Sequence, residues 1–229
     1  MVDSLVEKGI EACKSDNFKK GVELFNQALE KQPEHISGLY NRARALSKIQ
    51  RLEDALLDFE KLAKLQPNNA TFIGDYAVAL HLNGENDEAN VQFEKALELE
   101  PENPYRWSSR AFFKDRIGEG EAALADYEKA VELDPDDAIA LNNKGLIEEK
   151  LGYQERSKKS FNQSNKIIGY EPKEGEKQEE KSEPKTSSVP KKESQEILTR
   201  WKVIKSIFTK EGFQDFSQFT KNKILGKKD

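Results

Sequence analysis

Side chains suited to acid–base or nucleophilic chemistry are few in this chain of 229 residues. It has one cysteine, Cys13, and two histidines, His35 and His81. None of the three has a Cys or His partner at the spacing of a metal site. The sequence also contains no glycine-rich phosphate loop, nucleophile elbow or His-Glu metal motif. It therefore predicts a protein without enzymatic activity and without a cofactor or a metal.

The acidic and basic residues are unevenly distributed. Residues 1–170 carry a net charge of -8, residues 171–192 are neutral, and residues 193–229 carry +3. We expect the carboxylates of the first segment to lie on solvated helix faces, where they favour solubility. An acidic body argues against nucleic acid as a partner.

The chain is organised by a period of 34 residues. The segment 123–135, ALADYEKAVELDP, recurs in altered form from Gly21, Ala55, Ala89 and Ser157. An aromatic residue and a proline keep the same spacing, at Phe25, Phe59, Phe93, Tyr127 and Phe161 and at Pro33, Pro67, Pro101 and Pro135. Coincidences of this number at one fixed period indicate a repeat protein.

Each repeat divides into two halves of helical length. In the second repeat, Leu39, Ala43 and Leu46 fall at i, i+4 and i+7, which is one face of a helix. Short polar or glycine-containing breaks follow the first halves, and the prolines follow the second halves. Because glycine is typical of helix C-termini and proline stops a helix, the pattern predicts a helix, a tight turn and an antiparallel helix.

Small residues recur in both halves and predict close contact between the two helices. We expect the small residues of the first halves to face those of the second halves, so that the two backbones approach closely. The aromatic series, which includes Phe59, then fills the space toward the next repeat. The small residues of the first halves are Gly9, Ala43, Ala77, Ala111 and Gly145.

These units resemble tetratricopeptide repeats. The fourth unit matches the family pattern best, with Trp107, Ala111, Ala123, Tyr127, Ala130 and Pro135. Lys114 and Glu148 depart from it where an apolar residue is usual. The resemblance implies an all-α, right-handed α-solenoid of five antiparallel helix pairs, at residues 2–35, 36–69, 70–103, 104–137 and 138–170. The fifth unit is atypical at Ser157, Ser164 and Gly169, as expected of a terminal repeat.

The resemblance further implies a concave wall built from the first helices, with one stripe of side chains per unit projecting inward. The middle of this stripe is apolar in four units of five, which favours a groove that accepts a partner's extended or helical peptide. The alternative is that some of these side chains pack within the wall. We expect the groove to be lined by Tyr40, Arg44, Lys48, Val78, His81, Tyr105, Phe112, Arg116 and Leu146.

The clamp that some family members use for the C-terminal carboxylate of chaperones does not fit this sequence. Of the clamp positions only Asn41 matches, and Asp75 would repel a carboxylate. Recognition of chaperone tails by such a clamp is therefore not expected.

The composition changes after residue 170. Residues 171–192 are rich in Glu, Lys, Pro and Ser and predict a disordered charged linker. Residues 193–229 regain helical periodicity and predict an amphipathic helix that docks through Trp201, Ile204 and Phe208. This tail could fold back on the repeats, dock on a partner, or lie on an anionic membrane, the last being the weaker alternative.

The sequence thus favours a non-catalytic scaffold that binds a protein or peptide in its groove. The alternative function is a tail-led adaptor, in which residues 193–229 engage a partner or membrane while the repeats oligomerise or brace it. A lone cysteine and the absence of an apolar stretch near 18 residues fit a cytoplasmic protein.

Overall fold

The computed structural model describes residues 1–170, which form ten α-helices and no strand. The predictions for residues 171–229, namely the disordered linker, the amphipathic helix and docking through Trp201, Ile204 and Phe208, lie outside the described residues. The helices are α1 (Val2–Lys14), α2 (Phe18–Lys31), α3 (Ile36–Lys48), α4 (Leu52–Leu65), α5 (Ala70–Leu82), α6 (Asn86–Leu99), α7 (Pro104–Arg116), α8 (Gly120–Leu133), α9 (Ala138–Lys150) and α10 (Gln154–Ile167).

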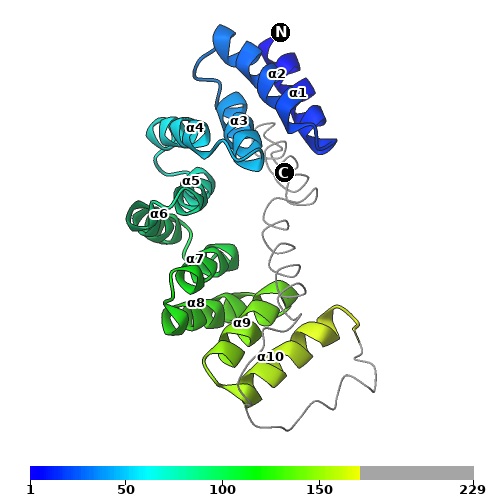
Figure 1. Cartoon of the computed structure of the whole chain (residues 1–229), viewed down its shortest axis with the longest axis vertical. Helices are drawn as coiled ribbons and strands as arrows, with labels where there is room; N and C mark the ends of the chain where they lie inside the picture. The colour runs from blue at the N-terminus through cyan, green and yellow to red at the C-terminus, as the bar shows by residue number, and fades with distance from the viewer. Residues whose placement is uncertain (171–229) are drawn as a thin grey trace, which may run out of the picture. The chain divides into compact units, whose positions relative to one another are not determined.

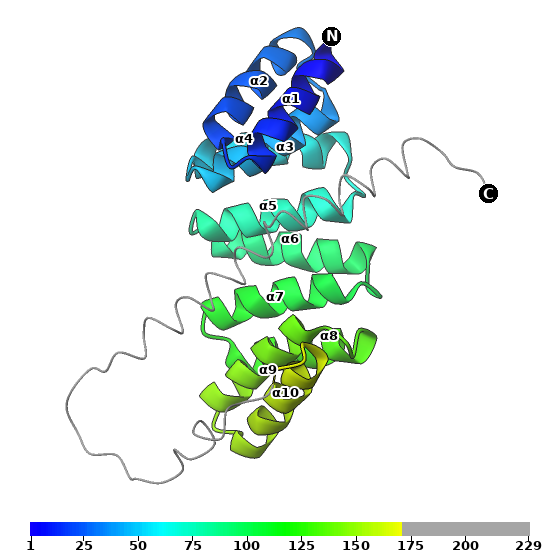
Figure 2. The ribbon, with the colours of Figure 1, turned by 90° about the vertical axis from the view of Figure 1, so that its right-hand side faces the viewer.

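The helices form five antiparallel pairs, which confirms the all-α solenoid (Figure 1). The pairs follow one another along an arc in which the odd-numbered helices lie on the inner side and the even-numbered helices on the outer side. Figure 2 shows α5, α6 and α7 crossing the stack one after another. We call α1, α3, α5, α7 and α9 the inner helices and the others the outer helices. No helix in residues 1–170 is long and apolar enough to span a membrane.

The turns inside the pairs explain where the inner helices end. In these turns the second residue after the inner helix has a left-handed backbone, with φ of 88° at Gly84, 92° at Gly118 and 86° at Gly152. Glycine adopts this conformation without a steric cost. Asp16 and Gln50 hold the same position in the first two pairs, with φ of 58° and 63°.

The outer helices end two residues before each repeated proline. The capping residue that precedes the proline is not helical, as at Gln66 with φ -136° and ψ 73° and Glu100 with φ -136° and ψ 65°. Steric contact with the proline ring disfavours helical geometry for the preceding residue. The next inner helix then begins at a capping side chain, such as Asn69 or Asp137, which accepts backbone N–H groups.

The small residues allow the paired helices to approach closely, as the sequence predicts. A Cβ atom added at Gly9 would lie 2.4 Å from the Phe25 ring, and one at Gly21 would lie 2.3 Å from Cys13 Sγ. The corresponding Ala43, Ala77 and Ala111 are fully buried. Successive pairs are joined by aromatic packing, for example between Phe93 and Phe113, whose stacked ring centroids are 5.0 Å apart.

Not every carboxylate lies on a solvated face, which corrects the expectation from sequence. Asp58 accepts two hydrogen bonds of 2.7 Å from Arg42, and Asp126 accepts two of 2.8 and 2.7 Å from Arg110. Lys114 adds a 3.1 Å contact to Asp126. Both aspartates are buried between the helices of one pair. The aspartates and their arginines are 16 positions apart, so the pairing appears only when the two helices are brought together.

Glu148 is a third buried carboxylate, with an exposed fraction of 0%. It accepts hydrogen bonds from Lys144 at 2.8 Å, Ser160 at 2.7 Å and Arg156 at 3.1 Å. Burial opposes its ionisation, but these hydrogen bonds and positive charges outweigh burial and hold the pKa of Glu148 below its usual value. The two departures from the family pattern, Lys114 and Glu148, are therefore both members of ion pairs within a repeat.

Candidate functional site

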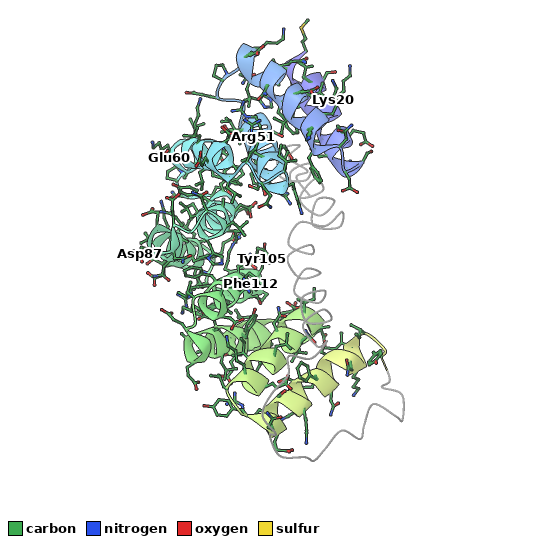
Figure 3. All side chains as sticks on the ribbon, in the orientation of Figure 1. Lys20, Arg51, Glu60, Asp87, Tyr105 and Phe112 are labelled. Atoms are coloured by element: carbon green, nitrogen blue, oxygen red, sulfur yellow. The ribbon has the colours of Figure 1, made fainter. Side chains whose placement is uncertain are left out.

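The apolar surface of the inner helices is concentrated in the last three repeats. Tyr105 and Ile139 are 40% and 49% exposed and occupy the same position in successive repeats. Val78, Phe112 and Leu146 share a second position, and all three are half-buried. We call these five side chains the apolar inner strip. Figure 3 shows Tyr105 and Phe112 on the inner side of the stack, while Glu60 and Asp87 lie on the opposite side.

Tyr40 and Arg44 differ from the expectation that they supply exposed contact area. Their exposed fractions are only 3% and 6%. The Tyr40 hydroxyl donates a 2.7 Å hydrogen bond to Asp75 Oδ2, and the Tyr40 ring lies 5.0 Å from that of Phe72. These contacts hold the Tyr40 side chain between α3 and α5. Tyr40 therefore packs within the wall, which was the alternative to lining the groove.

Charge inside this wall is balanced locally. The Arg44 guanidinium lies 5.5 Å from the Tyr40 ring centroid. Burial disfavours its charge, but Tyr40 and Asp75 outweigh burial and raise the pKa of Arg44. Burial, reinforced by Asp75, also raises the pKa of the Tyr40 hydroxyl well above its usual value. Asp75 is therefore the partner of Tyr40 and Arg44 inside the wall.

The remaining predicted residues lie at the C-terminal ends of the inner helices. His81 is half-buried, with Nδ1 2.8 Å from Asn86 Oδ1 and its ring edge-on to Phe113 at 5.2 Å. Lys48 is half-buried and Arg116 is exposed. Nothing in residues 1–170 tests whether these three side chains contact a ligand, so that role stays a prediction.

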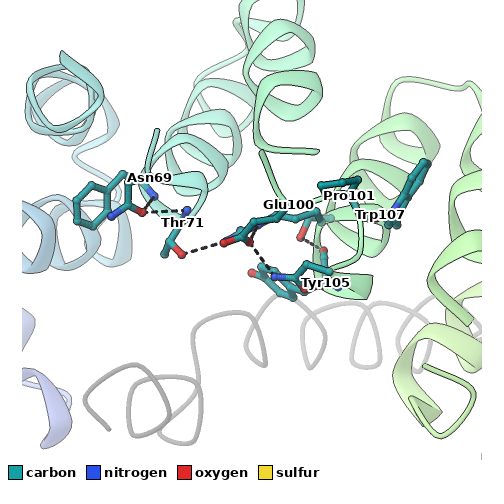
Figure 4. A network of polar contacts seen from close by, with 10 residues as sticks. Asn69, Thr71, Glu100, Pro101, Tyr105 and Trp107 are labelled. Carbon is teal, nitrogen blue, oxygen red and sulfur yellow. Dashed lines mark hydrogen bonds and ion pairs between the residues drawn. The ribbon is translucent and has the colours of Figure 1, made fainter. Parts of the chain in front are cut away.

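A polar network that the sequence did not reveal joins α5 to α7 beside the apolar inner strip (Figure 4). Buried Arg106 donates from Nε to Glu100 Oε2 at 2.8 Å and from Nη2 to Thr71 Oγ1 at 3.0 Å. A Cβ atom at Gly74 would lie 2.9 Å from Arg106 Nη1, so glycine leaves the room that the guanidinium fills. The network fixes the start of α7, where Tyr105 is located. The one signal in the sequence was an arginine at a repeat position that is apolar or small in the other units.

The groups that could carry other chemistry do not converge. No cluster of three or more His, Cys, Asp or Glu within residues 1–170 is arranged to hold a metal ion. Cys13 is buried against Gly21, and burial raises the pKa of its thiol to about 11. His35 caps α3 and lies 2.9 Å from Asp3.

Three family models match the chain. They are a TPR repeat over residues 117–152, the YpiA-like C-terminal tetratricopeptide repeats over residues 38–103, and a tetratricopeptide repeat over residues 138–168. Together they cover parts of four of the five predicted units.

Solved structures with the same fold come from several proteins of low sequence identity. MamA has a TM-score of 0.61 at 19% identity, over 70% of this chain and 94% of its own. TTC0263, a thermophilic TPR protein of Thermus thermophilus, has 0.61 at 17% identity, over 74% and 92%. YrrB, described as a TPR protein with an unusual peptide-binding site, has 0.55 at 16% identity, over 72% and 85%. At these low sequence identities, the similarity shows that the fold is shared.

Proposed function

The chain is a tetratricopeptide-repeat protein, and from this premise we propose that its inner helices bind a peptide or helix of a partner protein. Proteins of this family act in general as interaction scaffolds without enzymatic activity. The binding surface in this proposal is the apolar inner strip on α5, α7 and α9. We also place the protein in the cytoplasm, on the basis of its lone cysteine.

The main support for this binding surface is that the apolar inner strip continues over three successive repeats. Tyr105 and Ile139 offer exposed area at one position, and Val78, Phe112 and Leu146 line the neighbouring position. In the first two repeats the same positions hold Asp3, Ser37, Ile10 and the buried Arg44. A partner that buries apolar side chains therefore gains most on the C-terminal three repeats.

The environment of the apolar inner strip supports specific binding. The Arg106 network and the packing of Tyr40 hold the surrounding wall in one arrangement, so little ordering remains to oppose association. Tyrosine is enriched among the residues that contribute most to binding energy, which singles out the exposed Tyr105 within the apolar inner strip. YrrB provides a precedent for peptide binding on this fold.

The test is a selection of peptides from a random display library on the full chain, followed by calorimetry with the enriched peptides. Tyr105→Ala combined with Ile139→Gln should weaken binding by about tenfold or more, because the few residues that dominate an interface lie near its centre and cost about 2 kcal/mol or more when truncated. The matched control is Leu57→Gln with Val91→Gln, two similarly exposed apolar residues on outer helices. Unchanged affinity in the first variant and loss in the second would overturn the proposal.

A further inference from the structure

Two polar residues lie between the apolar positions of the inner strip in the last two repeats. Ser108 on α7 and Asn142 on α9 are 34 residues apart and so hold one position in successive repeats. On α7, Tyr105, Ser108 and Phe112 fall at i, i+3 and i+7 and share one helix face, and α9 repeats this spacing. At the helical rise per residue, the middle position is about 4.5 Å along the axis from the first and about 6 Å from the third. We call Ser108 and Asn142 the polar middle row.

Neither member of the polar middle row has a hydrogen-bond partner for its side chain within residues 1–170. The Ser108 hydroxyl oxygen is enclosed by protein atoms and makes no hydrogen bond. The Asn142 side chain is half-buried and its amide makes none. The adjacent Ser109 differs, since its hydroxyl donates a 2.7 Å hydrogen bond to the backbone oxygen of Tyr105. Because a serine hydroxyl can turn between staggered positions, both members of the row can hydrogen-bond to a ligand.

The main chain of an extended segment fits this arrangement. In an extended chain, successive side chains point to opposite sides, and the N–H and C=O groups point at right angles to them. A segment that lies across α7 and α9 over the polar middle row directs its side chains in turn to the Tyr105 position and to the Phe112 position. The N–H and C=O groups of every second residue then face the row, where the Asn142 amide donates and accepts and the Ser108 hydroxyl does either.

A bound helix does not fit the polar middle row. The main-chain groups of a helix are already hydrogen-bonded within it, so a helix offers only side chains. Its apolar face would cover Ser108 and Asn142 and remove their water without supplying partners, and buried polar groups without partners weaken binding. Extended and helical ligands therefore make opposite demands on this row.

We propose that the polar middle row makes the inner side selective for an extended segment of a partner protein, held by hydrogen bonds to its main chain. This inference rests on the proposed function, because it concerns the same site. Ser108 and Asn142 select the backbone conformation of the ligand, while the apolar inner strip selects its side chains. The ligand is therefore expected to carry apolar residues at consecutive positions, and not at the i, i+3 and i+4 spacing of an amphipathic helix.

The test uses the full chain and the most enriched peptide of the display selection, made by synthesis. Asn142→Leu keeps a side chain of similar size but removes its hydrogen-bonding groups. In calorimetry this change should weaken the binding of an extended peptide by about tenfold or more, whereas a helical peptide would gain apolar contact and bind more tightly. Ser108→Ala should also weaken binding. The matched control is Asn165→Leu, a half-buried asparagine on the outer helix α10 without a side-chain hydrogen bond in residues 1–170, which should leave the affinity unchanged.

Changes in the peptide main chain identify the groups that bind. Replacing single amide N–H groups of the peptide by ester oxygens removes one donor at a time and keeps every side chain. The affinity losses should fall on alternate residues, and at least one of them should disappear in Asn142→Leu. Thermal unfolding of each protein variant checks that it is folded.

The inference is overturned if Asn142→Leu raises the affinity or leaves it unchanged, or if the ester losses are the same in both proteins. If binding then still depends on Tyr105 and Ile139, the proposed function stands and only this inference fails. A selection that enriches no peptide, or peptides that bind independently of Tyr105, Ile139 and Asn142, would overturn both.

Discussion

At the scale of single residues, the structure separates side chains that maintain the wall from side chains that are available for contact. Tyr40, Arg44 and Arg106 are polar yet buried, and each has partners on a neighbouring helix or its own. Tyr105 and Ile139 are apolar yet exposed. Residue type alone does not make this division, since Tyr40 is buried and Tyr105 is exposed, so burial decides which side chains can contact a ligand.

Glu148 provides a prediction with a defined pH dependence. Because the pKa of Glu148 is depressed in the folded protein, its charge stabilises the fold above its unfolded pKa, and this stabilisation is lost as pH falls through the folded pKa. Glu148→Gln should therefore lower the free energy of unfolding by about 3 kcal/mol at pH 7, as expected for breaking a buried ion pair. The difference should vanish in strong acid. Urea unfolding of both proteins between pH 7 and pH 3 measures it, and a difference independent of pH would contradict this account.

Asp126 provides a second prediction at this scale. Asp126→Ala leaves the half-buried Arg110 and Lys114 without their shared carboxylate, which should cost about 3 kcal/mol of stability. Glu94→Ala is the matched control, since Glu94 is exposed and makes no ion pair within residues 1–170. Its effect should stay within about 0.5 kcal/mol. Equal losses in the two variants, measured by thermal unfolding, would show that the Asp126 pair adds nothing.

At the scale of helices and turns, the 34-residue period determines most of the structure. The proline and glycine positions end the helices where the sequence predicts, because one restricts the preceding residue and the other accepts a left-handed backbone. The departures are also informative. Asp16 and Gln50 take the left-handed conformation without being glycine, so the first two turns store a small steric cost that the later turns avoid.

That difference between turns predicts a stabilising substitution. Gln50→Gly should raise the free energy of unfolding by about 1 kcal/mol, because glycine adopts a positive φ without strain. The reciprocal change, Gly84→Gln, should lower it by a similar amount, and nothing lies within 4 Å of the new Cβ to add another cause. Chemical denaturation of both variants provides the measurement. A loss of stability in Gln50→Gly would contradict the strain argument.

At the scale of the whole molecule, the sequence predicted the repeat fold and only part of the candidate site. Periodicity reports which positions recur, and it correctly identified the close approach of the paired helices at Gly9 and Gly21 and the positions of Tyr105 and Phe112 on inner helices. It assigned Phe25 to the space toward the next repeat, whereas the Phe25 ring packs against Gly9 within its own pair. It could not identify contacts between positions that do not recur. The Arg106 network and the burial of Tyr40 depend on one particular neighbour in three dimensions. The ion pairs of Asp58 and Asp126 do recur, at the same positions of the second and fourth repeats, but their arginine partners become apparent only when the two helices are packed together.

The division of charge between the two sides of the solenoid is likewise a property of the assembled structure. Helices α3 and α7 carry a net positive charge, and helices α4, α6 and α8 carry a net negative charge. Pairing of the helices brings several of the inner cations onto outer carboxylates, as with Arg42 on Asp58 and Arg110 on Asp126, so part of this charge is cancelled within the repeats. We therefore expect the inner side to select its partner through the apolar inner strip and not through charge.

The most direct test of the inner binding face is hydrogen exchange of the full chain with and without a library-selected peptide. Our account predicts that the peptide slows exchange in α5, α7 and α9, and that Tyr105→Ala with Ile139→Gln abolishes this effect. Protection confined to α4, α6 and α8, or protection that survives the two substitutions, would contradict it.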